Sequence, residues 1–507
     1  MGNVKQYEII EQNDKAVSIK VFNQIREFKV VTNNDIKSMV DKGEDIVLEN
    51  CYIKDFCYWK VCGYNSSREA EEDNYNKKKP LNNFCARKAF FGGDVDFTYA
   101  QFGNGYVDFS NAQFWDGNVY FTQAQFGVNN VDFIGAQFGG AVYFTQAQFS
   151  NSNVDFTLTK FGGFVDFIGA EFGDNDVFFF GAEFGDSDVF FFGAQFGDGK
   201  VDFSNVQFGN GDVIFSGVSF GRSLILLDNV VIKGRLFLEP ASCIETNLCI
   251  LSCYFLSHAS IDITHIKHLF FDGCTNSSVL SINASADYSD EQKSIALFNH
   301  SNVGTLNINW GRIKDAVKRF DFSFLNDIKD KPFVLERFSE LDNLDELKAD
   351  EYVMLKENFH NQGRYDWEDE AYVEFKRIDT NLLKFQKGVS GIGKKAKNRI
   401  KYPILKILER IGKYGTDPFS VFLTMILSVI FFGGLYSWLP CAEISASIDK
   451  IHWWSGLYYS AITFFTIGYG DLSAQNGLTA VLCALEGFLG VFLMSYFSVA
   501  LVRKILR

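Results

Sequence analysis

A short repeat dominates the middle of the chain and restricts what this part can fold into. It begins with valine at positions 95, 107, 119, 131, 142, 154, 165, 177, 189, 201 and 213, so its period is 12, shortened twice to 11. Each copy contains roughly Val-Asp-Phe-x-x-Ala-Gln-Phe-Gly-x-x, with its two phenylalanines five positions apart. A helix would scatter such residues around its surface, whereas a coil of short strands stacks equivalent residues on one another. The repeat therefore predicts a β-helix with phenylalanine ladders inside.

Charge is concentrated in the same block and argues against one class of partner. Residues 90 to 220 contain 16 Asp and Glu against Lys160 and Lys200, so this block carries the whole net charge of -14. Phosphate binding needs clustered Lys and Arg, so we expect no nucleic-acid partner. The ten cysteines form no CxxC pair, which is typical of reduced thiols in the cytosol. The sequence offers no catalytic arrangement, and we do not expect an enzyme.

The repeat resembles the pentapeptide-repeat family, whose units are A-(D/N)-(L/F)-x-x. Here the units Val-Asp-Phe-x-x and Ala-Gln-Phe-x-x are followed by one or two extra residues. The resemblance implies a cytoplasmic, right-handed quadrilateral β-helix in which two of these repeats make one coil. We place it at residues 91–312, with less regular coils after residue 222. Residues 1–90 are interpreted as a cap on its exposed end.

Acidic residues recur at one place in the repeat and are candidate metal ligands. Because they lie one repeat apart, we expect them to stack at one corner and to offer oxygen ligands for calcium, although solvated acidic corners are the alternative. These residues are Asp174, Asp176, Asp186, Asp188 and Asp198.

Residues 313–413 have a different, charged and helical pattern. Apolar residues at three and four spacing precede and follow Gly363, for example Leu355 and Phe359 before it and Phe375 after it. This pattern predicts a helical hairpin with Gly363 as a helix stop. Residues 388–413 are basic, which favours a flexible linker or an amphipathic helix at the membrane surface.

The last part of the chain, residues 414–507, contains two segments long and apolar enough to cross a bilayer. They are residues 419–438 and 478–502, and the apolar segment 453–465 between them is too short to cross. Eight basic residues flank the spans on their outer sides, whereas Lys450 is the only Lys or Arg between them. This uneven distribution of basic residues predicts a multi-pass protein of the cell membrane with both termini in the cytoplasm.

The short segment leads into Thr466, Ile467, Gly468, Tyr469, Gly470 and Asp471. Glycine permits backbone torsions that other residues resist, so the carbonyls of this segment can all point one way. Carbonyl rings from four chains can replace the water around a potassium ion. Together with its flanking spans, the motif resembles the two-transmembrane potassium channel family over roughly residues 415–507. The resemblance implies an all-α pore, a homotetramer with three further copies of the chain, and potassium ions in a filter at residues 466–471.

The resemblance also suggests roles for residues around the filter. Tyr469 would be braced from behind, against Trp453 or Trp454. Glu486, an acid well inside the second span, is interpreted as a polar brace behind the filter, with an incidental water-exposed site as the alternative. Gly490 stands where the family commonly carries a hinge glycine, although close helix packing is an equal alternative. One face of the second span would line the inner cavity and gate, through Val491, Met494, Ser498 and Val502.

The sequence therefore predicts a potassium-selective channel without a voltage sensor. Its partners would be membrane lipid and an unknown cytoplasmic ligand or protein that regulates it through the β-helix. In the alternative, the channel is constitutive and the repeat domain is a scaffold for protein interaction or assembly.

Overall fold

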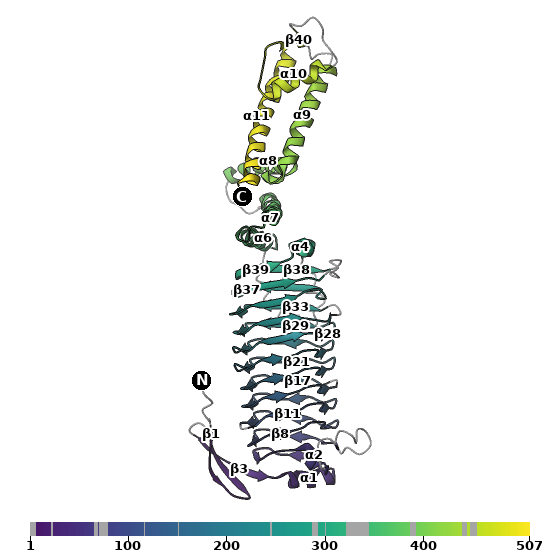
Figure 1. Ribbon diagram of the computed structural model, residues 1–507, viewed down its shortest axis with the longest axis vertical. Helices are drawn as coiled ribbons and strands as arrows, with labels where there is room; N and C mark the ends of the chain where they lie inside the picture. The colour runs from purple at the N-terminus through teal and green to yellow at the C-terminus, as the bar shows by residue number, and fades with distance from the viewer. Residues whose placement is uncertain are drawn as a thin grey trace. The chain divides into compact units, whose positions relative to one another are not determined.

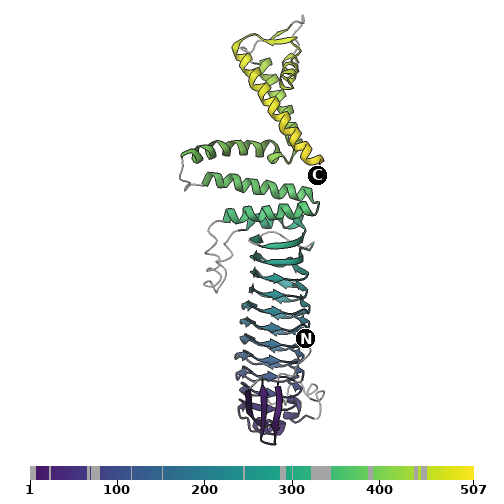
Figure 2. The same cartoon turned by 90° about the vertical axis from the view of Figure 1, so that its left-hand side faces the viewer.

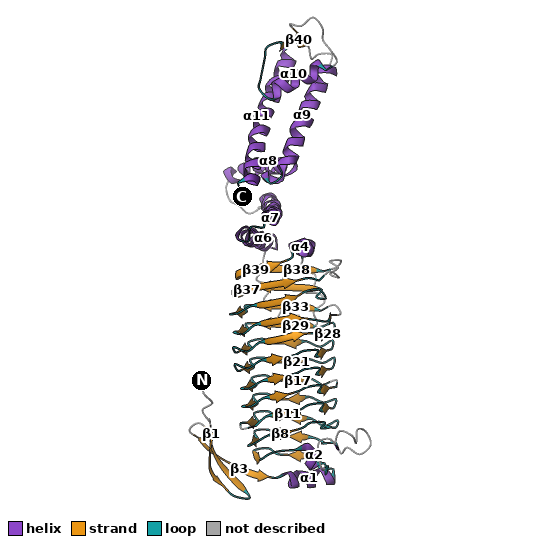
Figure 3. Ribbon diagram, in the orientation of Figure 1, coloured by secondary structure: helices purple, strands orange, loops and turns teal. Residues whose placement is uncertain are grey.

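In a computed structural model, the chain divides into two compact units, Met1–Glu340 and Leu341–Arg507. The first is a β-solenoid followed by a helix, and the second is mainly helical (Figures 1 and 3). The finer domain boundaries expected from the sequence stay predictions. The described residues are 7–21, 24–64, 69, 80–115, 117–150, 152–243, 246–285, 293–299, 301–320, 344–385, 392–438, 444–446 and 454–506.

An antiparallel meander and a capped helix precede the coils. The elements are β1 (Tyr7–Gln12), β2 (Ala16–Val21), β3 (Gln24–Val31), α1 (Asn33–Lys42) and, further on, α2 (Tyr58–Val61). Thr32 and Asp35 form a capping box, in which each side chain accepts a hydrogen bond from the backbone N–H of the other. β3 pairs in parallel with β5 of the first coil, so the meander is continuous with the solenoid sheet.

Each regular coil contains four short strands that pair in parallel with equivalent strands one coil away. Val131 pairs with Val107 in the coil before it and with Val154 in the coil after it. One valine of the repeat, Val119, lies between Val107 and Val131 in the sequence, so two repeats make one coil, as predicted. Successive coils stack along the length of the unit (Figure 2). The handedness implied by the family resemblance stays a prediction.

The first two ladders of parallel strands run from the cap to the last coils. Ladder one contains β4 (Ile46–Val47), β6 (Phe84–Cys85), β9 (Val107–Asp108), β13 (Val131–Asp132), β17 (Val154–Asp155), β21 (Val177–Phe178), β25 (Val201–Asp202), β29 (Leu224–Asp228), β33 (Asn247–Leu251), β36 (His268–Asp272) and β38 (Ser294–Asn299). Ladder two contains β5 (Cys51–Ile53), β7 (Phe90–Phe91), β10 (Gln113–Phe114), β14 (Gln137–Phe138), β18 (Lys160–Phe161), β22 (Glu183–Phe184), β26 (Gln207–Phe208), β30 (Val231–Ile232) and β34 (Tyr254–Phe255).

In each coil, the strands of the other two ladders follow those of the first two. Ladder three contains β8 (Val95–Asp96), β11 (Val119–Tyr120), β15 (Val142–Tyr143), β19 (Val165–Asp166), β23 (Val189–Phe190), β27 (Val213–Ser216), β31 (Leu236–Glu239) and β35 (Ala259–Asp262). Ladder four contains β12 (Gln125–Phe126), β16 (Gln148–Phe149), β20 (Glu171–Phe172), β24 (Gln195–Phe196), β28 (Ser219–Phe220) and β32 (Ser242–Cys243). In the last coils, the longer strands β37 (Thr275–Asn283) and β39 (Asn302–Ile308) continue ladders two and three.

Stacked phenylalanines form the core, as the repeat predicts. Phe144, for example, is fully buried and stacks on Phe121 at 5.0 Å and on Phe167 at 4.9 Å between ring centroids, with nearly parallel rings. Because the strand spacing of about 4.8 Å matches a comfortable stacking distance, every coil can add one ring to each ladder without strain.

Helix α4 (Trp310–Arg319) follows the last coil and packs on it. Its side chains Trp310, Ile313, Ala316 and Val317 are buried and lie on one face of the helix. An amphipathic helix of this kind shields the apolar end of a solenoid from water.

The second unit contains the helical hairpin and the two apolar helices. Its elements are α6 (Leu344–Asn361), α7 (Tyr365–Phe385), α8 (Ile392–Gly412), η2 (Lys413–Gly415), α9 (Pro418–Trp438), β40 (Ile444–Ala446), α10 (Ser455–Phe464), β41 (Leu472–Ala474) and α11 (Gly477–Ile505). Gly363, with φ of 68°, lies between α6 and α7, where the left-handed conformation ends a helix. α9 and α11 are long and apolar enough to cross a membrane.

Candidate ion-conduction site

The filter segment leaves α10 with alternating backbone torsions. Thr466, Gly468 and Gly470 have positive φ values of 54°, 57° and 78°, whereas Ile467 and Tyr469 between them do not. The N–H of Ile467 donates to the carbonyl of Ile462 at 2.9 Å, which fixes the segment to the end of α10. Tyr469 is 71% exposed in the single chain. The segment is therefore an accessible strand of backbone whose conformation depends on its glycines.

Close packing of small residues positions α10 against α9. A Cβ atom on Gly433 would lie 2.8 Å from the Cα atom of Leu457, and one on Gly456 would clash with the side chain of Ser437. Glycines at such a crossing let the two backbones approach each other. This close packing fixes the position of α10, and of the segment 466–471 that follows it, along α9.

Glu486 joins α9, α10 and α11. It is fully buried on α11, and its Oε2 atom accepts a hydrogen bond of 2.8 Å from the hydroxyl of Tyr436 on α9. Its Oε1 atom accepts one from the hydroxyl of Ser460 on α10. The structure thus places the predicted brace residue behind α10 and supplies two partners that the sequence analysis did not name. Polar residues within apolar segments were the available signal for them.

Asp471 is held by the helix that precedes the filter. Its Oδ2 atom accepts a hydrogen bond of 2.8 Å from the hydroxyl of Tyr458, another residue that the sequence analysis missed. Trp454 packs edge-on against Tyr458, with 5.9 Å between ring centroids. Trp454 thus contacts the residue that binds Asp471, and its bracing of Tyr469 stays a prediction. Trp453, the other residue expected behind the filter, lies outside the described residues.

Gly490 and Gly487 differ in their surroundings on α11. A Cβ atom on Gly490 would clash with the carbonyl oxygen of Phe464 at the end of α10, whereas one on Gly487 would lie 3.9 Å from the carbonyl oxygen of Thr463. Gly490 is therefore required for close packing of α11 on α10. Its role as a hinge stays a prediction.

The residues expected to line the inner cavity are unequally exposed. Val491 and Val502 are about half exposed, at 50% and 52%, and Ser498 is also exposed. Met494 is partly buried and packs against the cluster of Met425, Phe464 and Leu493. Three of the four residues predicted to line the cavity are thus exposed in the single chain.

The acidic residues predicted as calcium ligands do not share one corner, so this part of the prediction was wrong. Because a coil contains two repeats, residues one repeat apart belong to different ladders: Asp174 follows β20, whereas Asp186 follows β22. Asp198 does lie one coil from Asp174, and its N–H donates to the Asp174 carboxylate at 3.3 Å.

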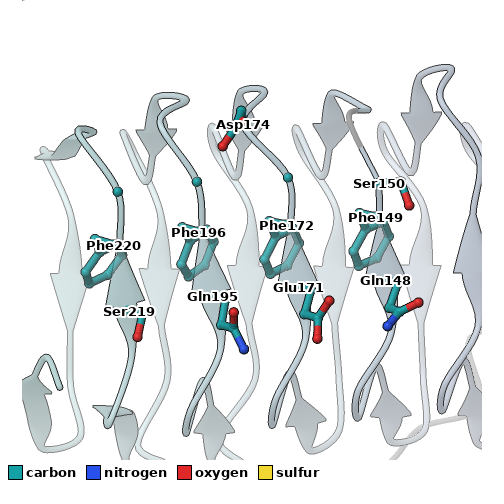
Figure 4. A pocket seen from close by; sticks show the side chains of 13 residues that line it. Gln148, Phe149, Ser150, Glu171, Phe172, Asp174, Gln195, Phe196, Ser219 and Phe220 are labelled. Carbon is teal, nitrogen blue, oxygen red and sulfur yellow. The ribbon is translucent and has the colours of Figure 1, made fainter. Parts of the chain in front are cut away.

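Each of these carboxylates links neighbouring coils. Asp176, Asp186, Asp188 and Asp198 likewise accept a backbone N–H from the next coil, donated by Lys200, Asn210, Asp212 and Arg222 respectively. Asp174 also lines a hollow of about 440 Å³ along ladder four, where Gln148, Glu171 and Gln195 point outward (Figure 4). Among the described residues, no group of three or more His, Cys, Asp or Glu is arranged to hold a metal ion. Calcium binding stays an untested prediction.

Comparison with known families identifies the C-terminal part. Residues 424–507 match the family described as Ion channel. This ion-channel domain covers most of α9 and all of α10, the filter segment and α11. No curated protein and no solved structure matches the chain. The chain thus joins an ion-channel domain with two candidate membrane helices to an N-terminal β-solenoid, and it is a membrane protein.

Proposed function

We propose that the chain is one subunit of a homotetrameric potassium channel in the cell membrane. The observation that carries the proposal is the sequence Thr-Ile-Gly-Tyr-Gly-Asp at 466–471, in an ion-channel domain and with positive φ at alternate residues. One chain supplies a quarter of each carbonyl ring, so three further copies complete the filter. Potassium ions would lie among the carbonyls of Thr466 to Tyr469.

Gating without a voltage sensor is part of the proposal. Within the described residues, the candidate spans are α9 and α11, and α9 contains no charged residue. A voltage sensor needs an arginine-rich span. The basic residues that flank the spans favour cytoplasmic termini and contact with the headgroups of membrane lipids.

The solenoid is proposed as the regulatory part, responding to a cytoplasmic ligand, a protein or calcium. Its covalent connection to the channel domain through α6, α7 and α8 supports this. Removal of residues 1–312 should change the open probability and abolish the response to ligand. An unchanged open probability would favour the alternative, in which the solenoid is a scaffold on a constitutive channel.

Ion flux from liposomes tests the selectivity. The full chain should release potassium but not sodium, and Gly468→Ala should abolish the flux because Ala resists a φ of 57°. Gly434→Ala is the matched control, since a Cβ atom there has nothing within 4 Å. Equal potassium and sodium flux, or full activity of Gly468→Ala, would contradict the proposal.

A further inference from the structure

Helix α7 contacts the last turn of α11 and the segment that leads into α9. Asp369, near the start of α7, binds the last turn of α11, whereas Arg377 and Thr380 in its second half bind the end of α8 and the turn η2 that follows it.

The contact with α11 consists of three ion pairs and one cation–π contact. Arg503 donates to the Asp369 carboxylate at 2.9 Å, and Lys504 donates to Asp366 at 2.8 Å and to Asp369 at 3.4 Å. The guanidinium of Arg503 also lies 4.3 Å from the ring centroid of Tyr372. The Asp369 side chain is 8% exposed and that of Arg503 22%. Because the pair is largely buried, loss of Asp369 leaves the Arg503 charge poorly compensated, whereas loss of Arg503 leaves Asp369 with the longer contact to Lys504.

Helix dipoles reinforce the same arrangement. Asp366 lies in the first turn of α7, where the helix end is partially positive, and Arg503 and Lys504 lie in the last turn of α11, where it is partially negative. The hydrogen bond from Lys504 holds the pKa of Asp366 below its ordinary value, so this carboxylate is charged at neutral pH.

The contact with the segment before α9 centres on Glu409, which lies in the last turn of α8. Its carboxylate accepts hydrogen bonds from Arg377 on α7 at 2.8 Å, from Lys406 at 2.9 Å and from Tyr414 at 3.2 Å. Burial raises the pKa of Glu409, but the bonds from Lys406 and Arg377 outweigh it and hold the pKa below its ordinary value. Thr380 on α7 lies 3.3 Å from the Tyr414 hydroxyl.

The turn itself is tightly shaped and contacts α11. Lys413, Tyr414 and Gly415 all have positive φ, of 46°, 58° and 83°. Tyr496 of α11 donates from its hydroxyl to the carbonyl of Leu408 on α8 at 3.1 Å, and a Cβ atom on Gly415 in the turn would lie 3.5 Å from the Tyr496 ring. The start of α9, the end of α11 and the body of α7 are therefore parts of one connected set of contacts.

We propose that Asp369 and Arg503 are positioning residues for the channel gate, and that their ion pair couples movement of α7 to the end of α11. This inference rests on the proposed function and adds the residues through which the helical hairpin acts. A displacement of α7 would have to move α11 or break the pair. A distant domain can shift a gate between open and closed when a contact between them has two discrete arrangements, here the ion pair formed or broken.

Charge exchange in the full-length protein tests the coupling. Asp369→Arg and Arg503→Asp should each change the ratio of open to closed time, in single-channel recordings in potassium, by about 5- to 150-fold, the usual size of such couplings. The double variant, which restores an ion pair in reverse, should return to within about twofold of the parent. Glu370→Arg, the same charge change at the next, exposed residue of α7, is the matched control and should have little effect.

The outcomes separate this inference from the proposed function. A parent protein without potassium current would refute both. A conducting parent whose single variants gate normally, or whose double variant is no closer to the parent than either single variant, would refute the coupling alone. If a reversed variant fails to assemble, Asp369→Asn and Arg503→Gln replace it. Each neutral variant removes the pair, so their effects should not add, and additive effects would overturn the proposal.

Discussion

The solenoid is stabilised by the same contact repeated in every coil, whereas the ion-channel domain is stabilised by contacts that each occur once. In the solenoid, Phe144 stacks between Phe121 and Phe167, and each of these two rings in turn stacks on an equivalent phenylalanine one coil further along, because each coil repeats the last. In the channel domain, single side chains such as Glu486 hold particular helices together. Repetition makes the solenoid tolerant of variation in any one coil, whereas the channel domain depends on individual contacts.

The largest expected effect tests whether the coils are equivalent. Phe156→Ala removes a fully buried ring that stacks on Phe133 and Phe179, and should destabilise its coil by about 3–5 kcal/mol. Phe144→Ala should cost nearly the same, since its surroundings are equivalent. Hydrogen exchange of the full chain, followed by mass spectrometry, measures the local opening free energy of each coil. Clearly different costs at the two positions would break the comparison.

A glycine pair tests the opposite behaviour in the channel domain. Gly490→Ala should destabilise the packing of α11 on α10 by about 1–3 kcal/mol, because the added methyl meets the backbone carbonyl of Phe464. Gly487→Ala, one turn earlier, should remain within about 0.5 kcal/mol of the parent. Thermal unfolding of the purified protein in detergent measures both. Similar effects at the two positions would mean that this helix crossing is not specific.

A smaller effect is expected at the buried acid. Glu486→Gln replaces one acceptor with an amide N–H₂ group, so that Tyr436 or Ser460 loses its acceptor, at a cost of about 0.5–1.5 kcal/mol. Leu485→Ala, a change at an exposed neighbour on the same helix, is the control. The thermal unfolding temperature should fall for Glu486→Gln and not for the control. A fall in both would assign the effect to α11 in general.

Periodic features of the sequence predicted the fold, because period translates directly into geometry. The phenylalanine spacing predicted the stacked coils, which are confirmed, and the apolar segments at 419–438 and 478–502 correspond to α9 (Pro418–Trp438) and α11 (Gly477–Ile505). The acidic corner was mispredicted because the length of a coil, and not the length of a repeat, decides which residues stack.

Contacts between residues far apart in the chain could not be predicted from the sequence. Tyr436 and Glu486 are 50 residues apart, and Asp369 and Arg503 are 134 apart. No spacing rule relates such residues, since their meeting depends on how the helices pack. The filter motif could be recognised because its chemistry lies within six consecutive residues, but its supporting residues, such as Tyr458, came only from the structure.

The smallest expected effects concern two aspartates of the solenoid. They test whether acidic residues in different coils contribute differently to stability. Burial, followed by the neighbouring Asp108 and Asp155 carboxylates, raises the pKa of Asp132. A raised pKa means that the folded state disfavours the charged form, so Asp132 lowers stability at neutral pH and ceases to do so as the pH falls through its raised pKa. Asp132→Asn should therefore raise the unfolding temperature at pH 7.

Asp212 should behave in the opposite way. Hydrogen bonds from Arg235 hold its pKa below the ordinary value, so its contribution to stability is present above a pH of about 4 and is lost as the pH falls through the lowered pKa. Asp212→Asn should slightly lower the unfolding temperature at pH 7, and the difference should disappear in acid. Arg235→Gln removes the partner and should abolish the difference between Asp and Asn at residue 212. Shifts of the same sign at both aspartates would mean that the solenoid responds to pH through its net charge, and not through these local contacts.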